Sequence, residues 1–402
     1  MSAERQKLFL YVCLVSAVWH IGVQWTNLLF PFLEWEVQPP LAMVDIGVIH
    51  ALGNLWNMIG AFLIGLLIDI YGLKICLISS AVSTSLYYFC IASSKGYWSF
   101  ILAQTFRLGF HFDHLTEIFV STITREGERT ADLLKLSIPA GASLMIGPFL
   151  AGKMTVLYDI RTAQFFNSFL TLAFILPPVI YLLPETHKLS PVYTAKLKLH
   201  QYWQMAYNDR LIKCIGLKAL LTASVICYEI VTWQHIVRRH SETPGDATVL
   251  FCILGSAILF MNFYGIRKLK HNFDPTTLVE IALVCLMISY LLLTVAKSYV
   301  FTVLLMILQT VSNAVATAEV MAQLIGTVER SHLGKASGLA RATQWLLQCS
   351  IPLVGSYVIQ NWSYSVLCIL AAAFAGLALV EIARYGRFLN TTMDELPWLL
   401  QS

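Results

Sequence analysis

Long apolar stretches alternate with short polar connections along almost the whole chain. A helix needs roughly 20 mostly apolar residues to cross the hydrocarbon core of a bilayer. Twelve stretches have this length, and they predict transmembrane helices at residues 8–33, 46–68, 75–94, 97–120, 133–155, 163–183, 211–236, 248–266, 276–296, 300–324, 335–359 and 364–384. The pattern therefore predicts an all-α integral membrane protein.

One connection is much longer than the others and divides the predicted helices into two sets of six. The expected organisation is an N-terminal six-helix bundle at 1–183, a central loop at 184–210, a C-terminal six-helix bundle at 211–384 and a tail at 385–402.

The two sets of helices echo each other. Glu128-Arg129 precedes a helix that contains Pro148, and Glu329-Arg330 precedes a helix that contains Pro352. The Glu-Arg pairs lie 201 residues apart and the prolines 204. Duplicated halves of this kind predict two pseudo-symmetric bundles around a central cavity, an arrangement found in transporters.

The composition excludes a soluble enzyme. Of the 402 residues, 57% are hydrophobic and only 12% are charged, whereas a soluble domain carries about a quarter charged residues. The formal net charge of +4 points to neither nucleic acid nor a strongly acidic partner. The nine cysteines fall inside apolar stretches without a CxxC pair, so we expect buried thiols, no metal site and no cofactor.

Lys and Arg residues gather on one side of the predicted membrane. With a cytosolic N-terminus, eighteen of them fall in cytosolic segments and six fall on the opposite side. Cytoplasmic loops carry an excess of these residues. We therefore expect both termini and the central loop to be cytosolic, in a multi-pass protein of the plasma membrane or an endomembrane.

Three motifs carry a family resemblance. The connection after the second predicted helix reads Gly65-Leu-Leu-Ile-Asp69-Ile-Tyr-Gly72-Leu-Lys74. It resembles the loop signature of the major facilitator superfamily, although Ile70 and Leu73 stand where basic residues are usual. The fifth helix contains Gly147-Pro148-Phe-Leu-Ala151-Gly152, which resembles the antiporter motif of that superfamily. Pro184-Glu185-Thr186 closes the first half, as is frequent in the superfamily.

The resemblance covers the whole chain, and the stretch from Glu329-Arg330 to Gly355 is similar to organic-cation-transporter-like and tetracycline-transporter-like solute carriers. It implies a latch in the first loop that holds the outward-facing state. The candidate conformational residues are Gly65, Asp69, Gly72, Lys74, Gly147, Pro148 and Gly152. The residues alone also fit a helix cap and a tight turn in the loop, and either a kink or close packing in the fifth helix.

Ionisable side chains inside a predicted membrane helix are the strongest functional signal, because each is costly in hydrocarbon. The fourth predicted helix carries Arg107, His111, Asp113, His114 and Glu117. At about 100° per residue of a continuous helix, these side chains cover less than half of the circumference. We expect this stripe to face a cavity or partner helices, with a carboxylate offsetting Arg107.

Polar side chains form further stripes on the first, seventh and tenth predicted helices. They are His20, Gln24 and Asn27 on the first, Lys218, Thr222 and Glu229 on the seventh, and Gln309, Asn313 and Glu319 on the tenth. The resemblance implies that these three helices line the central cavity with the fourth. We expect Glu229 and Glu319 to bind a cationic or polar solute, with Trp19 and Trp233 as candidates for cation–π contact.

These features predict a secondary active transporter of a small polar or cationic organic solute, working by proton-linked exchange and alternating access. Asp113 or Glu117 would bind the proton and Arg107 would adjust the proton affinity. His111 and His114 would relay the proton. We expect a monomer whose partners are the solute, protons and the lipid bilayer.

Several alternatives stay open on the sequence alone. The buried charges could form ion pairs that hold helices together, and a facilitated uniporter or a non-transporting receptor or scaffold could share the fold. An enzyme with a metal on His111 and His114 is not expected, because no second histidine box exists. The charged or titratable residues predicted to be structural are Glu280, Glu381, Arg384, Arg341 and His50.

Overall fold

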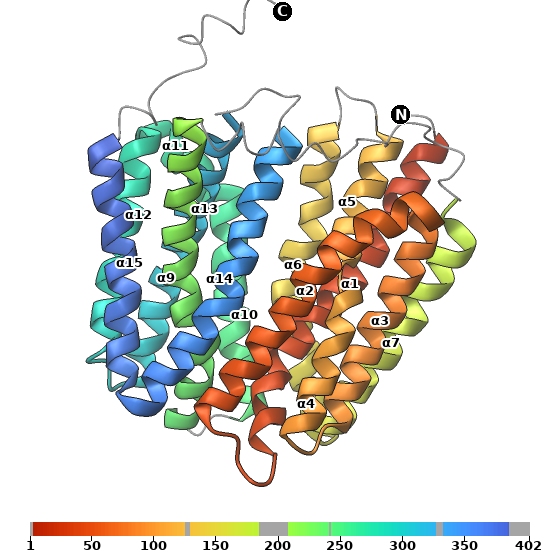
Figure 1. The fold of residues 1–402 in the computed structure, drawn as a ribbon, viewed down its shortest axis with the longest axis horizontal. Helices are drawn as coiled ribbons and strands as arrows, with labels where there is room; N and C mark the ends of the chain where they lie inside the picture. The colour runs from red at the N-terminus through yellow and green to blue at the C-terminus, as the bar shows by residue number, and fades with distance from the viewer. Residues whose placement is uncertain (1–2, 125–128, 185–207, 241–242, 327–332, 386–402) are drawn as a thin grey trace, which may run out of the picture. The chain divides into compact units, whose positions relative to one another are not determined.

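A computed structural model describes residues 3–124, 129–184, 208–240, 243–326 and 333–385 (Figure 1). The described residues are almost all helical, and no strand occurs among them. The helices before the central loop are α1 (Ala3–Trp35), α2 (Met43–Tyr71), α3 (Leu73–Ser93), α4 (Tyr97–Gln104), the 3₁₀ helix η1 (Thr105–Gly109), α5 (Phe112–Ile123), α6 (Arg129–Leu157) and α7 (Ile160–Leu182).

The helices after the central loop continue in the same manner. They are α9 (Asp209–His240), α10 (Pro244–Phe260), the π-helical turn η4 (Met261–Gly265), α11 (Ile266–Asn272), α12 (Pro275–Leu293), α13 (Tyr299–Gly326), α14 (Leu333–Asn361) and α15 (Tyr364–Tyr385).

The prediction of an all-α membrane protein is confirmed. Ten of the twelve predicted spans are single helices, whereas the fourth is divided into α4, η1 and α5, and the eighth into α10, η4 and α11. Within the described residues, nine helices are long and apolar enough to cross a membrane: α1, α2, α3, α6, α7, α9, α12, α13 and α15.

By their contacts, the residues group into two compact units. The first unit is Met1–Ala195 with Ile236–Ser256, and the second is Lys196–His235 with Ala257–Ser402. Most of α10 therefore groups with the first unit, although it follows the central loop in sequence. The predicted domain boundaries at 183 and 211 stay a prediction.

The first unit has two apolar core clusters, one on each side of the break in the fourth span. One cluster contains Trp25 and Phe100 and includes side chains of α4. The other contains Trp19 and Phe119 and includes side chains of α5. Phe110, within the break, packs against both clusters. The break therefore lies where the two cores meet, at a level that α1, α2 and α3 pass through as continuous helices.

Candidate functional site

The fourth predicted helix is interrupted where its polar residues begin. α4 tightens into η1, and the chain then leaves the helical conformation at Phe110 (φ −83°, ψ 59°) and His111 (φ −130°, ψ 27°) before α5 starts. The prediction of one continuous helix over 97–120 is therefore wrong. The single arc expected for its five polar side chains fails with it, since a rotation of about 100° per residue holds only in a regular helix.

Side chains from α2 and α3 replace hydrogen bonds that the break removes. Ser83 Oγ donates to the carbonyl of Phe106 at 2.7 Å. With the Asn57 amide oriented so that its nitrogen faces an acceptor and its oxygen faces donors, the nitrogen donates to the carbonyl of Arg107 at 2.9 Å. That carbonyl also accepts from the Phe110 N–H at 3.1 Å. Because buried backbone groups without partners cost free energy, these two side chains stabilise the broken conformation.

One face of α2 follows the break, at positions spaced i, i+3, i+4, i+7 and i+10. These residues are His50, Gly53, Asn54, Asn57 and Gly60. A β-carbon on Gly53 would collide with the side chains of Gln104 and Arg107, and one on Gly60 would collide with the carbonyl of Leu108. At Gly60 the backbone of α2 thus approaches the break so closely that only glycine fits. At Gly53 a larger residue would require the ends of the Gln104 and Arg107 side chains to move. Sequence reasoning missed this stripe, although its helical spacing was visible.

Arg107 is held by amides and an aromatic ring. Its Nη2 donates to Asn54 Oδ1 at 3.2 Å, and the amide oxygen of Asn57 accepts from Nη2 at 2.7 Å and from Nε at 3.2 Å. The guanidinium carbon lies 5.9 Å from the ring centroid of Tyr87, within the range of a cation–π contact. Among the described residues Arg107 makes no ion pair, so the expected carboxylate partner is wrong.

His111 also points into the first unit. It is 5% exposed, its backbone N–H donates to Ser80 Oγ at 3.3 Å, and its ring lies against Gly60. Arg107 and His111 therefore face α2 and α3, and not the surface that the next three predicted residues occupy.

α5 has one buried apolar face and one accessible polar face. Leu115 and Phe119 are fully buried, whereas Asp113, His114 and Glu117 are half-buried on the other side of the helix. His114 Nδ1 lies 3.6 Å from Glu117 Oε2, with side-chain exposures of 39% and 47%. The structure brings these three titratable groups together on the outside of the first unit.

The polar residues of α1 are accessible as well. His20 and Gln24 are partly exposed and Asn27 is exposed. His20 Nδ1 donates to the carbonyl of Ser16 at 2.8 Å, and Asn27 Nδ2 donates to Gln24 Oε1 at 3.3 Å. Since α1 contacts α5, two neighbouring helices of the first unit carry half-exposed polar side chains.

Trp19 does not join this surface. It is 5% exposed, its indole N–H donates to Thr84 Oγ1 at 3.3 Å, and its ring lies 5.1 Å from the ring of Phe110. The expected cation–π role for Trp19 is therefore wrong, because its ring faces the interior.

The motif in α6 packs closely against α1. A β-carbon on Gly147 would lie 2.7 Å from the carbonyl oxygen of Ile21 and 2.7 Å from the β-carbon of Gln24. Such distances are shorter than real side chains adopt, so α6 and α1 meet backbone to backbone at Gly147. Close packing by a small residue is thus present at this position.

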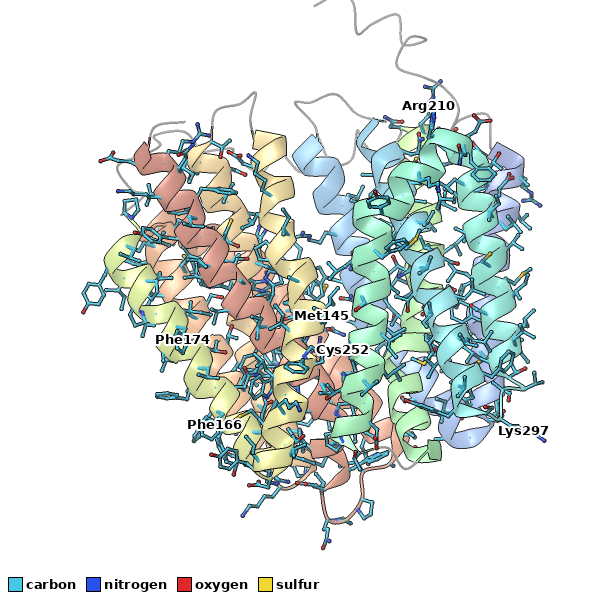
Figure 2. All side chains as sticks on the ribbon, turned by 180° about the vertical axis from the view of Figure 1, so that it is seen from behind. Met145, Phe166, Phe174, Arg210, Cys252 and Lys297 are labelled. Atoms are coloured by element: carbon cyan, nitrogen blue, oxygen red, sulfur yellow. The ribbon has the colours of Figure 1, made fainter. Side chains whose placement is uncertain are left out.

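The other side of the motif packs against α10 inside the first unit. Thr248 Oγ1 lies 2.8 Å from the carbonyl of Pro244 in its own helix, to which it donates, and 3.3 Å from the carbonyl of Pro148 in α6. A β-carbon on Gly152 would overlap the Thr248 side chain. Further along the pair, Cys252 Sγ donates to the carbonyl of Met145 at 3.7 Å (Figure 2). α6 and α10 therefore form an antiparallel seam of small residues.

In the second unit, the predicted residues of α13 have different surroundings. Gln309 is buried and its Nε2 donates to the Tyr290 hydroxyl at 3.4 Å. Asn313 is partly exposed and accepts from Thr317 Oγ1 at 3.1 Å. Glu319 is 2% exposed. Gln309 and Glu319 are therefore buried inside the unit, whereas Asn313 is accessible at its surface.

α9 confirms the position of the seventh predicted helix but not its chemistry. The backbone is helical over the whole of α9, and Ser224 Oγ donates to the carbonyl of Ala371 in α15 at 2.8 Å. The side chains of Glu229 and Trp233 lie outside the described residues.

Comparison with known proteins decides the family. The sequence model described as Major Facilitator Superfamily matches residues 12–274, more than half of the chain. The chain belongs to the major facilitator superfamily. It is therefore a membrane transporter in its fold and family and not an enzyme. No curated protein sequence matches it significantly.

Solved structures of superfamily transporters share the fold across almost the whole chain. The nucleoside transporter NupG has a TM-score of 0.73 at 12% identity and covers 96% of this chain and 100% of its own. The human organic anion transporter MFSD10 (TETRAN) scores 0.65 at 16%, covering 95% and 100%. A D-xylose-proton symporter scores 0.70 at 15%, covering 91% and 96%.

The superfamily's loop signature forms the turn between α2 and α3. Gly72 has φ 84° and ψ 161°, a conformation that residues other than glycine rarely adopt, and its N–H donates to the carbonyl of Ile68 at 2.9 Å. Asp69 lies in the last turn of α2, so it is not the residue that caps α3, and Lys74 lies in the first turn of α3. The surroundings of Gly65 and the side chain of Asp69 lie outside the described part of the chain.

One buried carboxylate of this facilitator chain was missed by the sequence reasoning. Asp132, in the first turn of α6, is 2% exposed and lies 3.0 Å from Lys135 Nζ and 3.6 Å from Arg5 Nη2. Thr124 Oγ1 also donates to it at 3.3 Å. These contacts join the starts of α1 and α6.

Proposed function

We propose that this chain transports a small polar or cationic organic solute by proton-linked exchange, through alternating access of its two halves. The observation that carries the proposal is the accessible polar face that α1 and α5 present on the first unit. In a membrane protein, titratable groups are costly unless they meet water or a partner.

The proton site of this proposal is the polar face of α5. Asp113 and Glu117 are carboxylates that can take up a proton. His114 lies 3.6 Å from Glu117, so a small side-chain movement brings the two into direct hydrogen-bonding distance. His111 is the buried neighbour at the start of the same helix. Arg107 acts on this site by fixing the break from which α5 begins.

The solute is proposed to bind His20, Gln24 and Asn27 on the first half, with Glu229, Gln309, Asn313 and Glu319 contributing from the second. Carboxylates on the polar face favour a cation over an anion. The neighbouring structures are named for a nucleoside, an organic anion and D-xylose, and their low identity supports the shared fold and not any one of these substrates.

We further propose a monomer with both termini and residues 184–210 in the cytosol. The bias of Lys and Arg between the two sides supports this orientation.

Counterflow in proteoliposomes tests the function directly. The panel is tetraethylammonium, uridine, D-xylose and p-aminohippurate, each with and without an imposed pH gradient. We expect counterflow of the organic cation, enhanced by the gradient, and alkalinisation or acidification of the lumen in step with solute movement. A non-transporting receptor gives no counterflow for any solute, and a uniporter gives counterflow that the gradient leaves unchanged.

Neutral variants then test the proton site. Asp113→Asn and Glu117→Gln, together, are expected to keep counterflow and lose the dependence on the gradient. Glu280→Gln in α12 is the matched control, because it also removes a carboxylate from a membrane helix. If the double variant keeps wild-type coupling, α5 does not carry the proton.

A further inference from the structure

The accessible polar face of α1 contains a proline in the interior of the helix. Pro31 lies inside α1, and with His20, Gln24 and Asn27 it occupies positions i, i+4, i+7 and i+11, which share one face of a helix. Asn27 is exposed and Pro31 is partly exposed, whereas the residues on either side of Asn27 are buried. The proline therefore lies on the same face as the polar side chains.

Pro31 changes the hydrogen bonding of Asn27. Because proline has no backbone N–H, the carbonyl of Asn27, four residues earlier, lacks the donor that a regular helix provides, and the proline ring crowds that carbonyl. No side chain among the described residues donates to it. The backbone oxygen of Asn27 is therefore available to accept a hydrogen bond from a ligand.

Two side-chain oxygens lie in the same turn of α1. Asn27 Nδ2 donates to Gln24 Oε1 at 3.3 Å, an arrangement that leaves Asn27 Oδ1 and the second lone pair of Gln24 Oε1 as acceptors. The stretch from Gln24 to Asn27 therefore presents three oxygens that can accept from N–H groups.

Two neighbouring helices hold this part of α1 in place. Asn167 of α7 donates to the carbonyl of Gly22 and to Thr26 Oγ1, both at 2.9 Å, and Gln164 of α7 donates to the same hydroxyl at 2.8 Å. On α6, Gly147 meets the backbone of α1. Acceptors fixed before binding lose little freedom when a ligand arrives, which favours affinity.

The depth of Asn27 in the helix excludes lipid as a suitable neighbour for these oxygens. Asn27 lies eight residues before Trp35, where α1 ends, which is about 12 Å along the helix axis. A carbonyl without its helical donor and a side-chain amide are costly against acyl chains, because nothing there donates a hydrogen bond. We therefore expect this part of the face to meet water or a ligand with hydrogen-bond donors.

We propose that the Asn27 carbonyl, together with the side-chain oxygens of Asn27 and Gln24, forms a subsite for the N–H groups of a protonated amine. Each acceptor carries a partial negative charge, so the subsite favours a cation over an anion. A primary ammonium has three N–H donors and a quaternary ammonium has none, so the subsite also favours the primary amine. The inference rests on the proposed function, whose solute class it narrows, but binding at the subsite requires neither transport nor a proton gradient.

Two probes of equal charge test the subsite. Benzylammonium and benzyltrimethylammonium share the aromatic ring and differ in their N–H donors, and their affinities for the full-length protein in lipid nanodiscs are measured by isothermal titration calorimetry. In Pro31→Ala the new N–H at position 31 donates to the Asn27 carbonyl and competes with the probe. We expect the affinity for benzylammonium to fall about tenfold, the effect of losing one hydrogen bond to a charged group. The affinity for benzyltrimethylammonium stays unchanged.

Pro177→Ala is the matched control. Pro177 also lies inside a membrane helix, α7, at an exposed position, and the carbonyl that its substitution would engage belongs to Ala173, outside the polar face. Both affinities are expected to stay at the wild-type value. Asn27→Ala covers the case in which Pro31→Ala does not fold, because it removes one side-chain oxygen and lowers the affinity for benzylammonium alone.

Four results would overturn the proposal: no binding of benzylammonium to the wild type, an unchanged benzylammonium affinity in the folded variants at positions 27 and 31, an equal loss for both probes, or the same loss in Pro177→Ala. An equal loss would show that Pro31 acts through the shape of α1 and not through the carbonyl. A selective loss in Pro31→Ala, together with counterflow that ignores the pH gradient, would refute the proton-linked exchange and leave the subsite standing.

Discussion

Asn57 binds Arg107 at two places at once. Its amide oxygen accepts from the guanidinium at 2.7 Å, and its amide nitrogen donates to the Arg107 backbone carbonyl at 2.9 Å. One side chain of α2 therefore satisfies both the charge and the backbone of a residue in the helix break. These contacts hold Arg107 to α2, and within the described ranges its guanidinium forms no ion pair with an acid of α5.

This relationship predicts a large stability loss in Asn57→Ala. The substitution removes the hydrogen bonds of Asn57 to the guanidinium and to the backbone carbonyl of Arg107, a loss of about 1–3 kcal/mol. The guanidinium keeps its hydrogen bond to Asn54, and the carbonyl still accepts from the Phe110 N–H. The measurement is the midpoint of thermal unfolding in detergent. Asn361→Ala is the control, because Asn361 makes its hydrogen bond to the Tyr357 carbonyl at an exposed helix end. Equal midpoints for the two variants would contradict the assignment.

The seam between α6 and α10 gives a second prediction. In Gly152→Ala the new methyl group overlaps Thr248, and overpacking of this kind costs about 1–3 kcal/mol. In a Thr248→Ala background the cost falls, since Oγ1 and Cγ2 of Thr248 are removed. A double-mutant cycle on unfolding midpoints measures this interaction.

Gly216→Ala is the control for the seam. A β-carbon there has nothing within 4 Å, so the better helix propensity of alanine makes the change neutral or slightly stabilising. Additive effects of Gly152→Ala and Thr248→Ala would show that the two residues do not meet.

The positions of the helices were predictable because length and apolar composition alone determine which segments can cross a bilayer. The break between Thr105 and His111 was not predictable in the same way. Each residue of that stretch tolerates a helix, and the alternative is stabilised by Asn57 and Ser83, which are distant in sequence. Hydropathy contains no term for such contacts.

The same limit explains the errors in the site. A carboxylate was expected beside Arg107, but amide oxygens and an aromatic ring satisfy a guanidinium as well. His111 and His114 were expected on one face, yet the break lies directly before α5 and turns them apart. The contact between His50 and Glu34 was not predicted, because the two residues lie on different helices.

The cap of α7 predicts a pH-dependent contribution to stability. Asp159 accepts from the Thr162 N–H at 3.1 Å, and its hydrogen bonds with Thr162 lower the pKa of the Asp159 carboxyl. A lowered pKa in the folded state means that the stabilisation is present above the ordinary carboxyl pKa, about 4. It is lost as the pH falls through the lowered value.

Asp159→Ala is therefore expected to cost about 1 kcal/mol near neutral pH and progressively less as the pH falls below about 4. Unfolding midpoints of the variant and the wild type, compared at a series of pH values, measure this. Asp159→Asn is the control, because it keeps an acceptor for the Thr162 N–H without a titrating group. If the difference in unfolding midpoint between Asp159→Ala and the wild type does not decrease at acidic pH, the capping role of Asp159 is contradicted.

A substitution at Gly72, in the turn between α2 and α3, distinguishes a structural role of this residue from a functional one. Gly72→Ala forces a side chain into φ 84°, which lowers the free energy of unfolding by about 1–2 kcal/mol. Gly96→Ala is the control, because Gly96 has φ −156° and a β-carbon there would have nothing within 4 Å. If the signature loop is a latch, Gly72→Ala also changes the rate of counterflow at temperatures well below unfolding. If the folded Gly72→Ala protein shows counterflow at the wild-type rate, Gly72 serves only to form the turn. A latch with altered geometry would release at a different rate.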